Sequence, residues 1–343
     1  MSWQFFGIDI DGSISGQSAL AQRLDKVADL KSLEGDLRLW ANEKGIRKLR
    51  MALRDLRIRR DFRWLSFLGS GDFHHVTSLL LEALPEECKP LTLVLIDNHP
   101  DWTHLPPAYH CGNWVSLVLQ QRWVDSVVMI GQNSDDLEAG NLWFSPFEDL
   151  YAGRLRLYPY AKECIFAPLR WPRQVRAATG TERRAGGTNM FFKTVKSKGI
   201  DRVAGEIAAS LAGTNVYISI DKDVLDPDYA LTDWDQGKLS LAELAAVIQK
   251  IAASCNLVGA DICGEMAPNP LKGPLKQIDS MRLWQSQRHD WQTANAINQE
   301  TNMRLLDTFT RVLEAKGEPF GSDAWLANMD HSLVSGRGMS VLK

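Results

Sequence analysis

Two short segments carry the residue types that bind metal ions. The first is Asp97-Asn98-His99-Pro100-Asp101, and the second, about 120 residues later, is Ser219-Ile220-Asp221-Lys222-Asp223. Each follows an apolar run typical of a buried strand, and metals and ligands commonly bind where the strands of an α/β protein end. Four carboxylates and an imidazole gathered there would repel one another unless a divalent cation stabilised them. The pattern predicts a metalloprotein.

The spacing within each segment favours shared ligation. Asp97, His99 and Asp101 are two residues apart, as are Asp221 and Asp223. In an extended segment such residues point to the same side and can converge. Oxygen donors with one or two imidazoles favour Mn²⁺ or a related first-row ion over the metals that thiolates select. A single Asp after a strand is usually a cap or turn former, but two such segments favour metal ligation.

The composition points to a globular protein with no strong electrostatic preference for a partner. The chain has 343 residues, 45% hydrophobic and 24% charged, with a net charge of −3. This balance argues against nucleic acid or a membrane surface as a partner. We expect a cytoplasmic protein, because there is no secretory signal or membrane-spanning run at the sequence level and the five cysteines include no CxxC pair.

Strand-like and helix-like segments alternate along the chain. Strands are expected at 5–10, 64–68, 91–96, 126–130, 154–158, 215–220 and 257–262, and helices at 15–33, 36–57, 74–84, 112–122, 200–212, 240–254 and 297–316. Ser240 and Glu243 form a predicted capping box. Apolar strands separated by helices predict a three-layer α/β/α fold with a mostly parallel central sheet. We expect one domain over 1–343.

Two regions depart from this alternation. Residues 167–199 are rich in Arg and Lys and contain one acid, Glu182. A solvated surface excursion is the favoured interpretation, and the alternative is a loop that recognises an anionic substrate group or an acidic neighbouring subunit. The Gln- and Asn-rich stretch 286–302 is expected to be a polar helix or loop at the surface.

Four motifs resemble those of the ureohydrolase superfamily, which includes arginase, agmatinase and formiminoglutamase. The family carries a Gly-Gly-Asp-His-type turn, an Asp-Ala-His-x-Asp segment, a Ser-x-Asp-x-Asp-x-x-Asp-Pro segment and a late Glu. In the same order, this chain has Gly69-Ser70-Gly71-Asp72-Phe73-His74-His75, then 97–101, then 219–227, then Asp261-Ile262-Cys263-Gly264-Glu265. The resemblance covers roughly residues 60–270.

This resemblance implies an arginase-like fold with two Mn²⁺ ions per chain. Asp97 and Asp221 would bridge the ions, Asp101 would bind one, and His99 with Asp223 would bind the other. The ions would share a hydroxide that attacks a C–N bond in a guanidino, formimino or related amide compound. The trimers and hexamers common in the family make a homo-oligomer the expected state.

The first motif leaves the remaining metal ligand open. Counting from Gly69 puts Asp72 in the place of the family histidine, whereas counting from Gly71-Asp72 puts His74 there. We expect His74 to be the ligand, with Asp72 and His75 as alternatives.

The substrate-binding and proton-transfer positions depart further from the family. Arginase-like enzymes carry Ser-Gly-Asn-x-His after the second motif, and the corresponding stretch here, 111–115, is Cys-Gly-Asn-Trp-Val. Asn113 matches the substrate-contacting Asn, but Val115 replaces the proton-shuttle His, so His104 or His110 is the candidate substitute. The departures as a whole argue against arginase itself.

The late glutamate is also displaced. Glu265 lies four residues after Asp261 instead of three. It is a candidate for catalysis and for bidentate binding of a guanidinium, with a helix cap as the alternative. Lys222, between two candidate ligands, is expected to point away from the metals.

Three functions follow from these observations. The leading hypothesis is a binuclear manganese hydrolase acting on a C–N bond of a small molecule other than a peptide. One alternative is a deacetylase-like amide hydrolase with a single Zn²⁺ ion on the same fold. The other is a non-catalytic family member that keeps a metal for stability or senses a small molecule.

Overall fold

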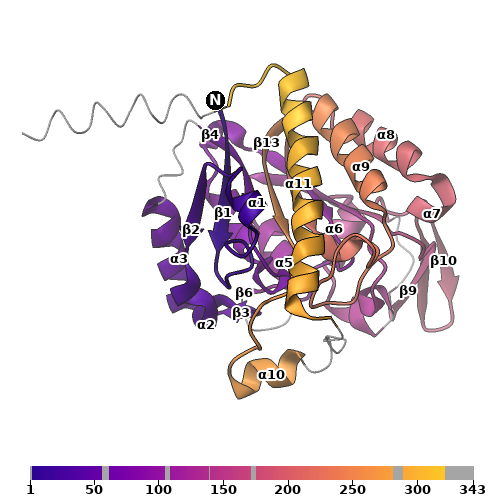
Figure 1. Cartoon of the computed structure of the whole chain (residues 1–343). Coiled ribbons are helices and arrows are strands. Elements are labelled where there is room, and N and C mark those ends of the chain that lie inside the picture. Colours follow the sequence, from indigo (N-terminus) through magenta and orange to yellow (C-terminus); the bar gives the residue numbers. More distant parts are fainter. Residues whose placement is uncertain are drawn as a thin grey trace, which may run out of the picture.

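Eight parallel strands form the centre of the molecule. The computed structural model describes residues 2–55, 62–104, 109–138, 140–170, 175–280 and 289–320. The strand order is β2-β1-β4-β13-β12-β5-β7-β8, and every neighbouring pair is parallel (Figure 1). The strands are β1 (Ser2–Asp9), β2 (Lys26–Asp29), β4 (Phe62–Phe67), β5 (Leu91–Ile96), β7 (Val124–Ile130), β8 (Leu155–Tyr158), β12 (Asn215–Asp221) and β13 (Asn256–Cys263). The predicted parallel sheet is confirmed.

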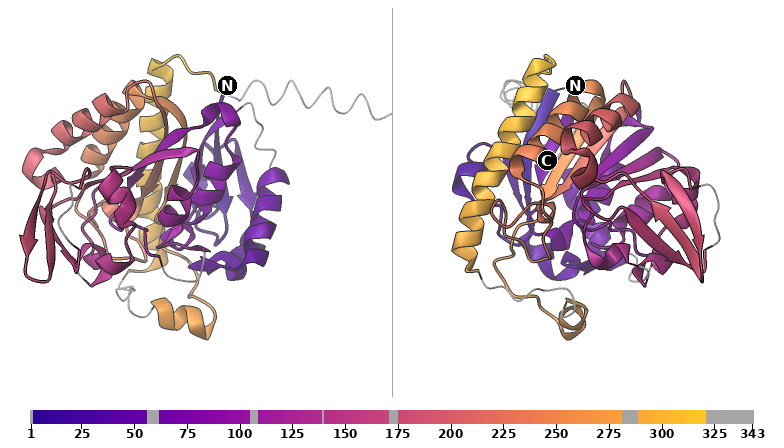
Figure 2. Two further views of the ribbon diagram at one scale, coloured as in Figure 1. Left: turned by 180° about the vertical axis from the view of Figure 1, so that it is seen from behind. Right: turned by 90° about the vertical axis from the view of Figure 1, so that its right-hand side faces the viewer.

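Helices cover both faces of this sheet. On one side pack α8 (Ile200–Ser210), α9 (Leu241–Ser254) and α11 (Trp291–Ala315), which lie beside one another in Figures 1 and 2. On the other side pack α3 (Glu43–Asp55), α4 (Val76–Ala83), α5 (Trp114–Leu119) and α6 (Phe147–Ala152). In β5, Leu93 and Leu95 pack on the side covered by α3 to α6, whereas Val94 and Ile96 pack on the side covered by α8, α9 and α11. Burial on both faces explains why this strand is apolar throughout.

Shorter elements connect these layers. The helices are α1 (Ser18–Ala21), α2 (Glu34–Leu37), α7 (Val195–Lys198) and α10 (Pro274–Ser280), and a short antiparallel pair is formed by β3 (Trp40–Ala41) and β6 (Tyr109–His110). The 3₁₀ turns are η1 (Lys31–Leu33), η2 (Gly71–Phe73), η3 (Glu86–Cys88), η4 (Asp135–Leu137), η5 (Asn141–Phe144) and η6 (Lys222–Val224).

Helix α9 begins at the predicted capping box. The Ser240 side chain accepts a hydrogen bond from the Glu243 N–H at 3.2 Å, and the Glu243 carboxylate accepts one from the Ser240 N–H at 2.8 Å. Two backbone donors that the first helical turn leaves free are thereby satisfied. A cap of this kind contributes about 1 kcal/mol to stability.

The expected helices at 15–33 and 36–57 are wrong in part. The first region contains the four-residue α1, then the edge strand β2, which pairs with β1 alone, and then the 3₁₀ turn η1. β2 is short and mostly exposed, so it lacks the apolar run that reveals a buried strand. In the second region the helical pattern is interrupted because Leu39 adopts a φ of 68°, and α3 begins only at Glu43.

The predicted basic excursion includes a small sheet at the edge of the molecule. β9 (Cys164–Pro168), β11 (Gly187–Phe191) and β10 (Gly180–Arg184) pair antiparallel in the order β10-β11-β9. All five residues of β10 are exposed, whereas Thr188 and Met190 of β11 are buried. Residues 171–174 lie outside the described part. The excursion therefore combines an exposed strand, β10, with a partly buried strand, β11, that packs on the protein.

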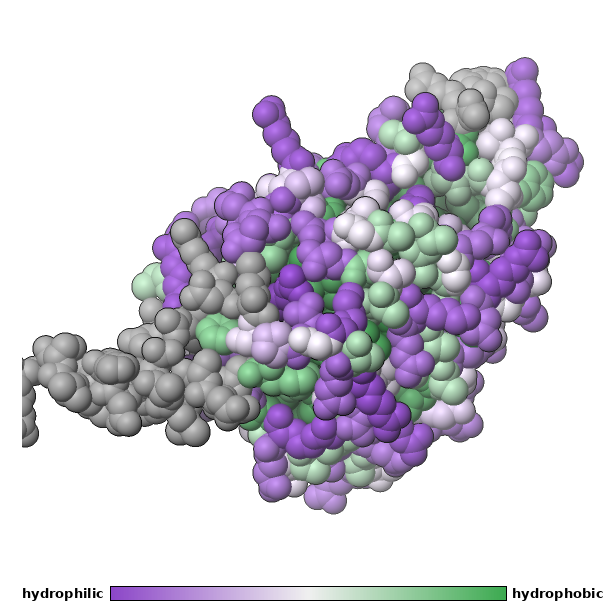
Figure 3. All heavy atoms as spheres, turned by 90° about the horizontal axis from the view of Figure 1, so that it is seen from above, coloured by the Kyte–Doolittle hydropathy of each residue, from purple (hydrophilic) through white to green (hydrophobic). Residues whose placement is uncertain are grey.

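The surface drawn in Figure 3 is mainly hydrophilic, with smaller hydrophobic areas between the polar side chains. Such interleaving is usual for a globular protein whose large apolar side chains fill the core. Among the described helices, none has the length and apolar character needed to cross a membrane.

Candidate metal centre

Four neighbouring strands bring the candidate ligands together. Asp97 directly follows β5, Asp221 ends β12 and Cys263 ends β13, while His74 lies beyond β4 at the end of turn η2. These strands are adjacent in the order β4-β13-β12-β5, and their carboxyl ends share one edge of the sheet. That edge is the usual ligand-binding position of an open α/β sheet.

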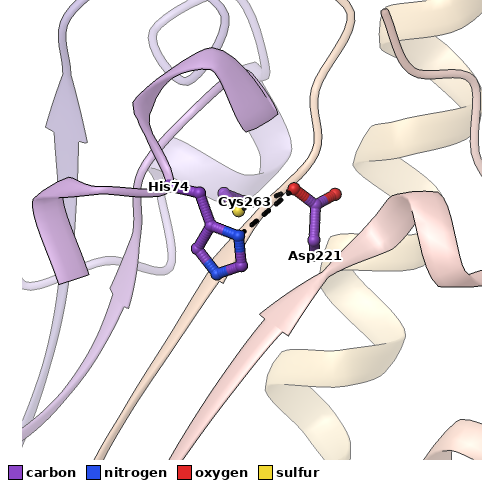
Figure 4. Close-up of side chains that lie close together, drawn as sticks. All are labelled: His74, Asp221 and Cys263. Atoms are coloured by element: carbon purple, nitrogen blue, oxygen red, sulfur yellow. Dashed lines mark hydrogen bonds and ion pairs between the residues drawn. The ribbon is translucent and has the colours of Figure 1, made fainter. Parts of the chain in front are cut away.

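His74 faces three carboxylates through its Nδ1 atom. Nδ1 lies 3.0 Å from Asp101 Oδ2, 3.3 Å from Asp97 Oδ2 and 3.6 Å from Asp221 Oδ2. All four side chains are buried. His74, Asp97 and Asp101 form one group able to hold a metal ion, and His74, Asp221 and Cys263 form a second (Figure 4).

The opposite ring nitrogen of His74 is held by a hydrogen-bond relay. Nε2 lies 2.9 Å from Ser219 Oγ, which donates to Asp261 Oδ1 at 2.7 Å, while the Tyr217 hydroxyl donates to Asp261 Oδ2 at 2.8 Å. Because the Ser219 proton is used on Asp261, its oxygen accepts the proton carried by Nε2. When His74 is neutral, this arrangement keeps its proton on Nε2 and directs the Nδ1 lone pair at the carboxylates, as a metal ligand requires.

His99 has the complementary arrangement. Its Nδ1 lies 2.9 Å from Asp136 Oδ2, and its Nε2 lies 3.0 Å from Asp235 Oδ1 and 3.6 Å from Asp223 Oδ2. A carboxylate behind one ring nitrogen fixes the other as the ligand atom. His99 is therefore oriented toward Asp223 and Asp235.

Asp97 and Asp221 each use one carboxylate oxygen for a backbone N–H and direct the other at His74. Asp97 Oδ1 accepts the His99 N–H at 2.6 Å and Asp221 Oδ1 accepts the Asp223 N–H at 2.9 Å, whereas the Oδ2 atom of each faces His74. Asn98 N–H donates to Asp223 Oδ1 at 3.0 Å. The two ligand segments are thus linked through backbone hydrogen bonds, which fix the aspartate side chains in place.

Buried atoms without hydrogen-bond partners show that this site suits a cation. Within the described residues, neither Asp97 Oδ2 nor His99 Nε2 makes a hydrogen bond, although both are buried. Burying such acceptors unpaired costs free energy, and a bound cation offsets that cost. The donor types, carboxylates with two imidazoles, fit divalent first-row ions.

The electrostatics agree with this interpretation. Burial, with Asp101 close by, raises the pKa of Asp97 to about 7, and burial beside Asp221 and Asp97 raises the pKa of Asp223 well above its usual range. Burial lowers the pKa of His74, but Cys263, Asp101 and Asp97 outweigh that effect and raise it well above its usual value. Perturbed groups clustered at one place are a signature of a functional site.

Two glycines allow the backbone to approach Asp221 closely. A Cβ added at Gly71 would lie 2.7 Å from Asp221 Oδ2, and one at Gly264, where φ is +91°, would lie 2.3 Å from Asp221 Oδ1. Neither position can accept a side chain without displacing this carboxylate. The residue inserted before Glu265 therefore shapes the metal site itself.

The two alternatives to His74, Asp72 and His75, differ in their surroundings. Asp72 Oδ2 accepts a hydrogen bond from Arg38 Nε at 2.8 Å, and its Oδ1 accepts one from Trp234 Nε1 at 3.1 Å. His75 is buried, its ring nitrogens make no hydrogen bond within the described residues, and burial lowers its pKa to about 3. His75 is thus held neutral in the core.

The Glu265 carboxylate has three partners within the described part of the chain. It forms an ion pair with Lys222 and accepts hydrogen bonds from Gln17 Nε2 at 2.8 Å and Asn302 Nδ2 at 2.7 Å. Lys222 and Glu265 are both buried. The Glu265 carboxylate, which was expected to bind a substrate cation, is therefore paired with the ammonium group of Lys222.

The candidate proton-transfer residues lie in and near the loop that follows Asp101. His104 is exposed, and residues 105–108 lie outside the described part. His110 is half-buried on β6, where its Nδ1 accepts the Gly112 N–H at 2.8 Å, and it is close enough to His75 to lower the pKa of that residue. Asn113 Oδ1 accepts the His110 N–H at 2.9 Å, which ties the two residues together.

Several site residues were missed in the sequence. Asp136 and Asp235 support His99, Trp114 Nε1 donates to Asp101 Oδ2 at 2.7 Å, and Cys263 lies beside Asp221. Asp136 lies in a turn and Asp235 in a loop, and neither follows a strand closely. Cys263 directly follows the predicted strand 257–262 inside a recognised motif, and that position was the available signal.

The fold is that of an arginase-like α/β protein, with a cluster of carboxylates and histidines that could hold a metal at the carboxyl edge of the sheet. Similar solved structures include an arginase from Bacillus subtilis (15% identity, TM-score 0.55, covering 90% of this chain and 98% of that one) and an agmatine ureohydrolase from Thermoplasma volcanium (15%, 0.53, 91% and 90%). A third is a proclavaminate amidino hydrolase from Streptomyces clavuligerus (18%, 0.52, 88% and 92%). At these identities the similarity establishes the fold.

Sequence comparisons indicate similarity to the arginase family over part of the chain. A model of the arginase family matches residues 173–273. An agmatinase from Halalkalibacterium halodurans is 46% identical over 66 residues, 18% of this chain and 22% of that protein. An uncharacterized protein from Thermotoga maritima is 26% identical over 208 residues, and this match spans 61% of the chain and only 60% of the relative. These matches, together with the shared fold, support a relationship of this chain to the ureohydrolase superfamily.

Proposed function

We propose that the chain is a binuclear metal-dependent hydrolase that cleaves a C–N bond in a guanidino, formimino or related amide compound. The observation that carries this proposal is the matched orientation of two histidines. His74 Nδ1 and His99 Nε2 each face carboxylates, while the opposite ring nitrogen of each is engaged by Ser219 or Asp136. Such support is characteristic of histidines that bind metal.

The proposed ligand sets are those that the family resemblance implies, with His74 added from the first motif. His74 and Asp101 would hold one ion, His99 and Asp223 would hold the other, and Asp97 and Asp221 would contribute to both. Two Mn²⁺ ions are the expected occupants, as in the arginases that this chain resembles. When bound, such ions lower the pKa of water and stabilise the negative charge that develops during hydrolysis.

The chain's own residues would position the substrate and move protons. Asn113 is the proposed substrate contact, and His110 or His104 the proposed proton-transfer group. For Glu265 to bind a guanidinium it would have to exchange Lys222 for the substrate cation. This requirement favours a substrate smaller or less cationic than arginine.

The first test is metal content with a ligand variant. Wild-type protein purified without chelator and incubated with Mn²⁺ should contain close to two Mn per chain, and Asp221→Ala should lose metal and activity while keeping its circular dichroism spectrum. Asp125→Ala, at an exposed position of β7, is the control. Full activity in Asp221→Ala would refute the proposal, and a single tightly held Zn²⁺ would favour the deacetylase-like alternative.

A non-catalytic role is the second candidate. It is favoured by Val115, a buried residue at the place of the family shuttle histidine, and by the occupied Glu265. Metal-loaded protein that hydrolyses no member of a broad guanidino, formimino and amide panel would support this role. The family likeness also suggests a homo-oligomer, which light scattering after size-exclusion chromatography tests.

A further inference from the structure

Cys263 brings a thiol into a site otherwise made of oxygen and nitrogen donors. It is the last residue of β13 and is fully buried. Its Sγ donates to Asp221 Oδ2 at 3.2 Å, and Figure 4 shows the sulfur beside His74 and Asp221. The sulfur, His74 Nδ1 or Nε2 and an Asp221 oxygen all lie within 4.8 Å of one another.

The separations between these atoms match those of ligands around one ion. Zinc–sulfur bonds of about 2.3 Å and zinc–nitrogen or zinc–oxygen bonds of about 2.0–2.2 Å place tetrahedral ligands roughly 3.3–3.8 Å apart. The distance from Cys263 Sγ to Asp221 Oδ2 is 3.2 Å, and that from His74 Nδ1 to Asp221 Oδ2 is 3.6 Å.

A second observation indicates that a ligand belongs here. Asp97 Oδ2 is buried, makes no hydrogen bond within the described residues and lies 3.3 Å from the same His74 Nδ1. It is a buried acceptor that shares the Nδ1 atom of His74 with two other carboxylates, those of Asp101 and Asp221. A cation bound beside the thiol would offset the charge of these clustered carboxylates.

We propose that Cys263 is a metal ligand, and that with His74 and Asp221 it makes one of the two metal positions selective for a thiophilic ion such as Zn²⁺ or Co²⁺. The proposal rests on the proposed function, since it refines the metal of the same site. On binding, the Cys263 thiol loses its proton to solvent and its sulfur forms a bond to the ion. Thiolate ligands select zinc over manganese, whereas oxygen and imidazole ligands accept manganese.

The two metal positions would therefore differ. His99 is surrounded by Asp223, Asp235 and Asp136, so its position offers only carboxylate and imidazole donors among these residues. That position would retain the preference for Mn²⁺ expected of the family. The protein would bind one thiophilic and one oxygen-preferring ion when both metals are present.

Cobalt spectroscopy of the full chain tests the ligand directly. Apo-protein titrated with Co²⁺ should develop a sulfur-to-cobalt charge-transfer band in the near ultraviolet, together with the visible bands of the bound ion. Cys263→Ser should lose the charge-transfer band while still binding Co²⁺. Cys255→Ser is the matched control, because Cys255 is also buried but precedes the opposite end of the same strand, about 25 Å away.

Metal competition gives a readout that does not depend on activity. Wild-type protein equilibrated with equal Zn²⁺ and Mn²⁺ should retain both metals, and Cys263→Ser should lower the ratio of bound Zn²⁺ to Mn²⁺ by at least about tenfold. Cobalt binding by wild-type protein without a charge-transfer band would overturn the assignment of Cys263 and leave the binuclear hydrolase standing. Wild-type protein that binds no metal would overturn both. The wild-type spectrum decides the question even if Cys263→Ser does not fold.

Discussion

Lys222 and Glu265 form a fully buried ion pair that joins the loop after β12 to the segment after β13. The ammonium group lies between two candidate ligands, Asp221 and Asp223, in sequence, yet its charge is directed at Glu265. Burial lowers the pKa of Lys222, and the attraction of Glu265 works against that effect. Gln17 and Asn302 complete the hydrogen bonding of the carboxylate. The pair holds the two segments that form the metal site against each other.

Removing the lysine should strongly destabilise the protein. In Lys222→Met, Glu265 keeps two amide donors but loses its only cationic partner among the described contacts, and an uncompensated buried charge costs about 3–5 kcal/mol. The free energy of unfolding, measured by urea denaturation of metal-free protein at pH 7, should fall by about that amount.

Two further variants isolate the pair. Lys222→Met combined with Glu265→Gln should lose less stability than the sum of the single changes, because the unpaired charge is gone. Lys48→Met removes the exposed partner of Asp36 and should cost less than about 1 kcal/mol. Equal losses for Lys48→Met and Lys222→Met would contradict the importance given to the buried pair.

The sheet could be predicted because its central strands are long and apolar on both faces. The run at 91–96 coincides with β5, and 215–220 and 257–262 each lie within one residue of β12 and β13 at either end. The edge strand β2 could not be predicted, since its four residues pair with a single neighbour and stay mostly exposed. The strength of the sequence pattern thus follows the amount of apolar surface that a strand buries.

The site was predictable where ligands follow strands and unpredictable where they come from loops. The sequence places five candidate ligands in or just after two strands. The structure brings Asp97, Asp101 and Asp221 to His74, and Asp223 to His99. Asp136 and Asp235 reach His99 only through tertiary packing of a turn and a loop. Local spacing contains no information about such contacts.

Asp136 provides a test of how His99 is oriented. Asp136→Ala removes the acceptor 2.9 Å from His99 Nδ1, so the ring is free to rotate or change tautomer. Loss of a supporting carboxylate typically lowers metal affinity 10–100-fold. Titration calorimetry with Mn²⁺ should show that decrease for the His99 position. Asp135→Ala, its exposed neighbour, is the control and should bind as wild type does.

A third prediction concerns Asp11, a buried carboxyl away from the ligand segments. Burial raises its pKa to about 6, although Ser13 donates to it from both N–H and hydroxyl. The folded state therefore holds this proton more tightly than the unfolded state, where the pKa is about 3.9. The stabilisation from the protonated form is complete below pH 4 and is lost as the pH rises to about 6.

Asp11→Asn should abolish this contribution while keeping an oxygen for Ser13. The free energy of unfolding of the variant, relative to wild type, should rise by about 2–3 kcal/mol between pH 4 and pH 7. Urea denaturation across that range measures the change, with Asp125→Asn as an exposed control. A constant difference between Asp11→Asn and wild type would show that Asp11 has an ordinary pKa.

Metal binding should stabilise the folded chain because the ligands converge only there. Asp97 directly follows β5 and Asp221 ends β12, and both contact His74. Because these strands are far apart in sequence, the unfolded chain cannot reproduce the site. At a free metal concentration of 100 times the dissociation constant, binding to the folded state alone adds about 2.7 kcal/mol. A chelator should lower the urea midpoint of wild-type protein and leave Asp221→Ala unchanged. The same midpoint for wild type with metal and with chelator would mean that these buried carboxylates are stable without a cation, and that their raised pKa values, not an ion, relieve the repulsion between them.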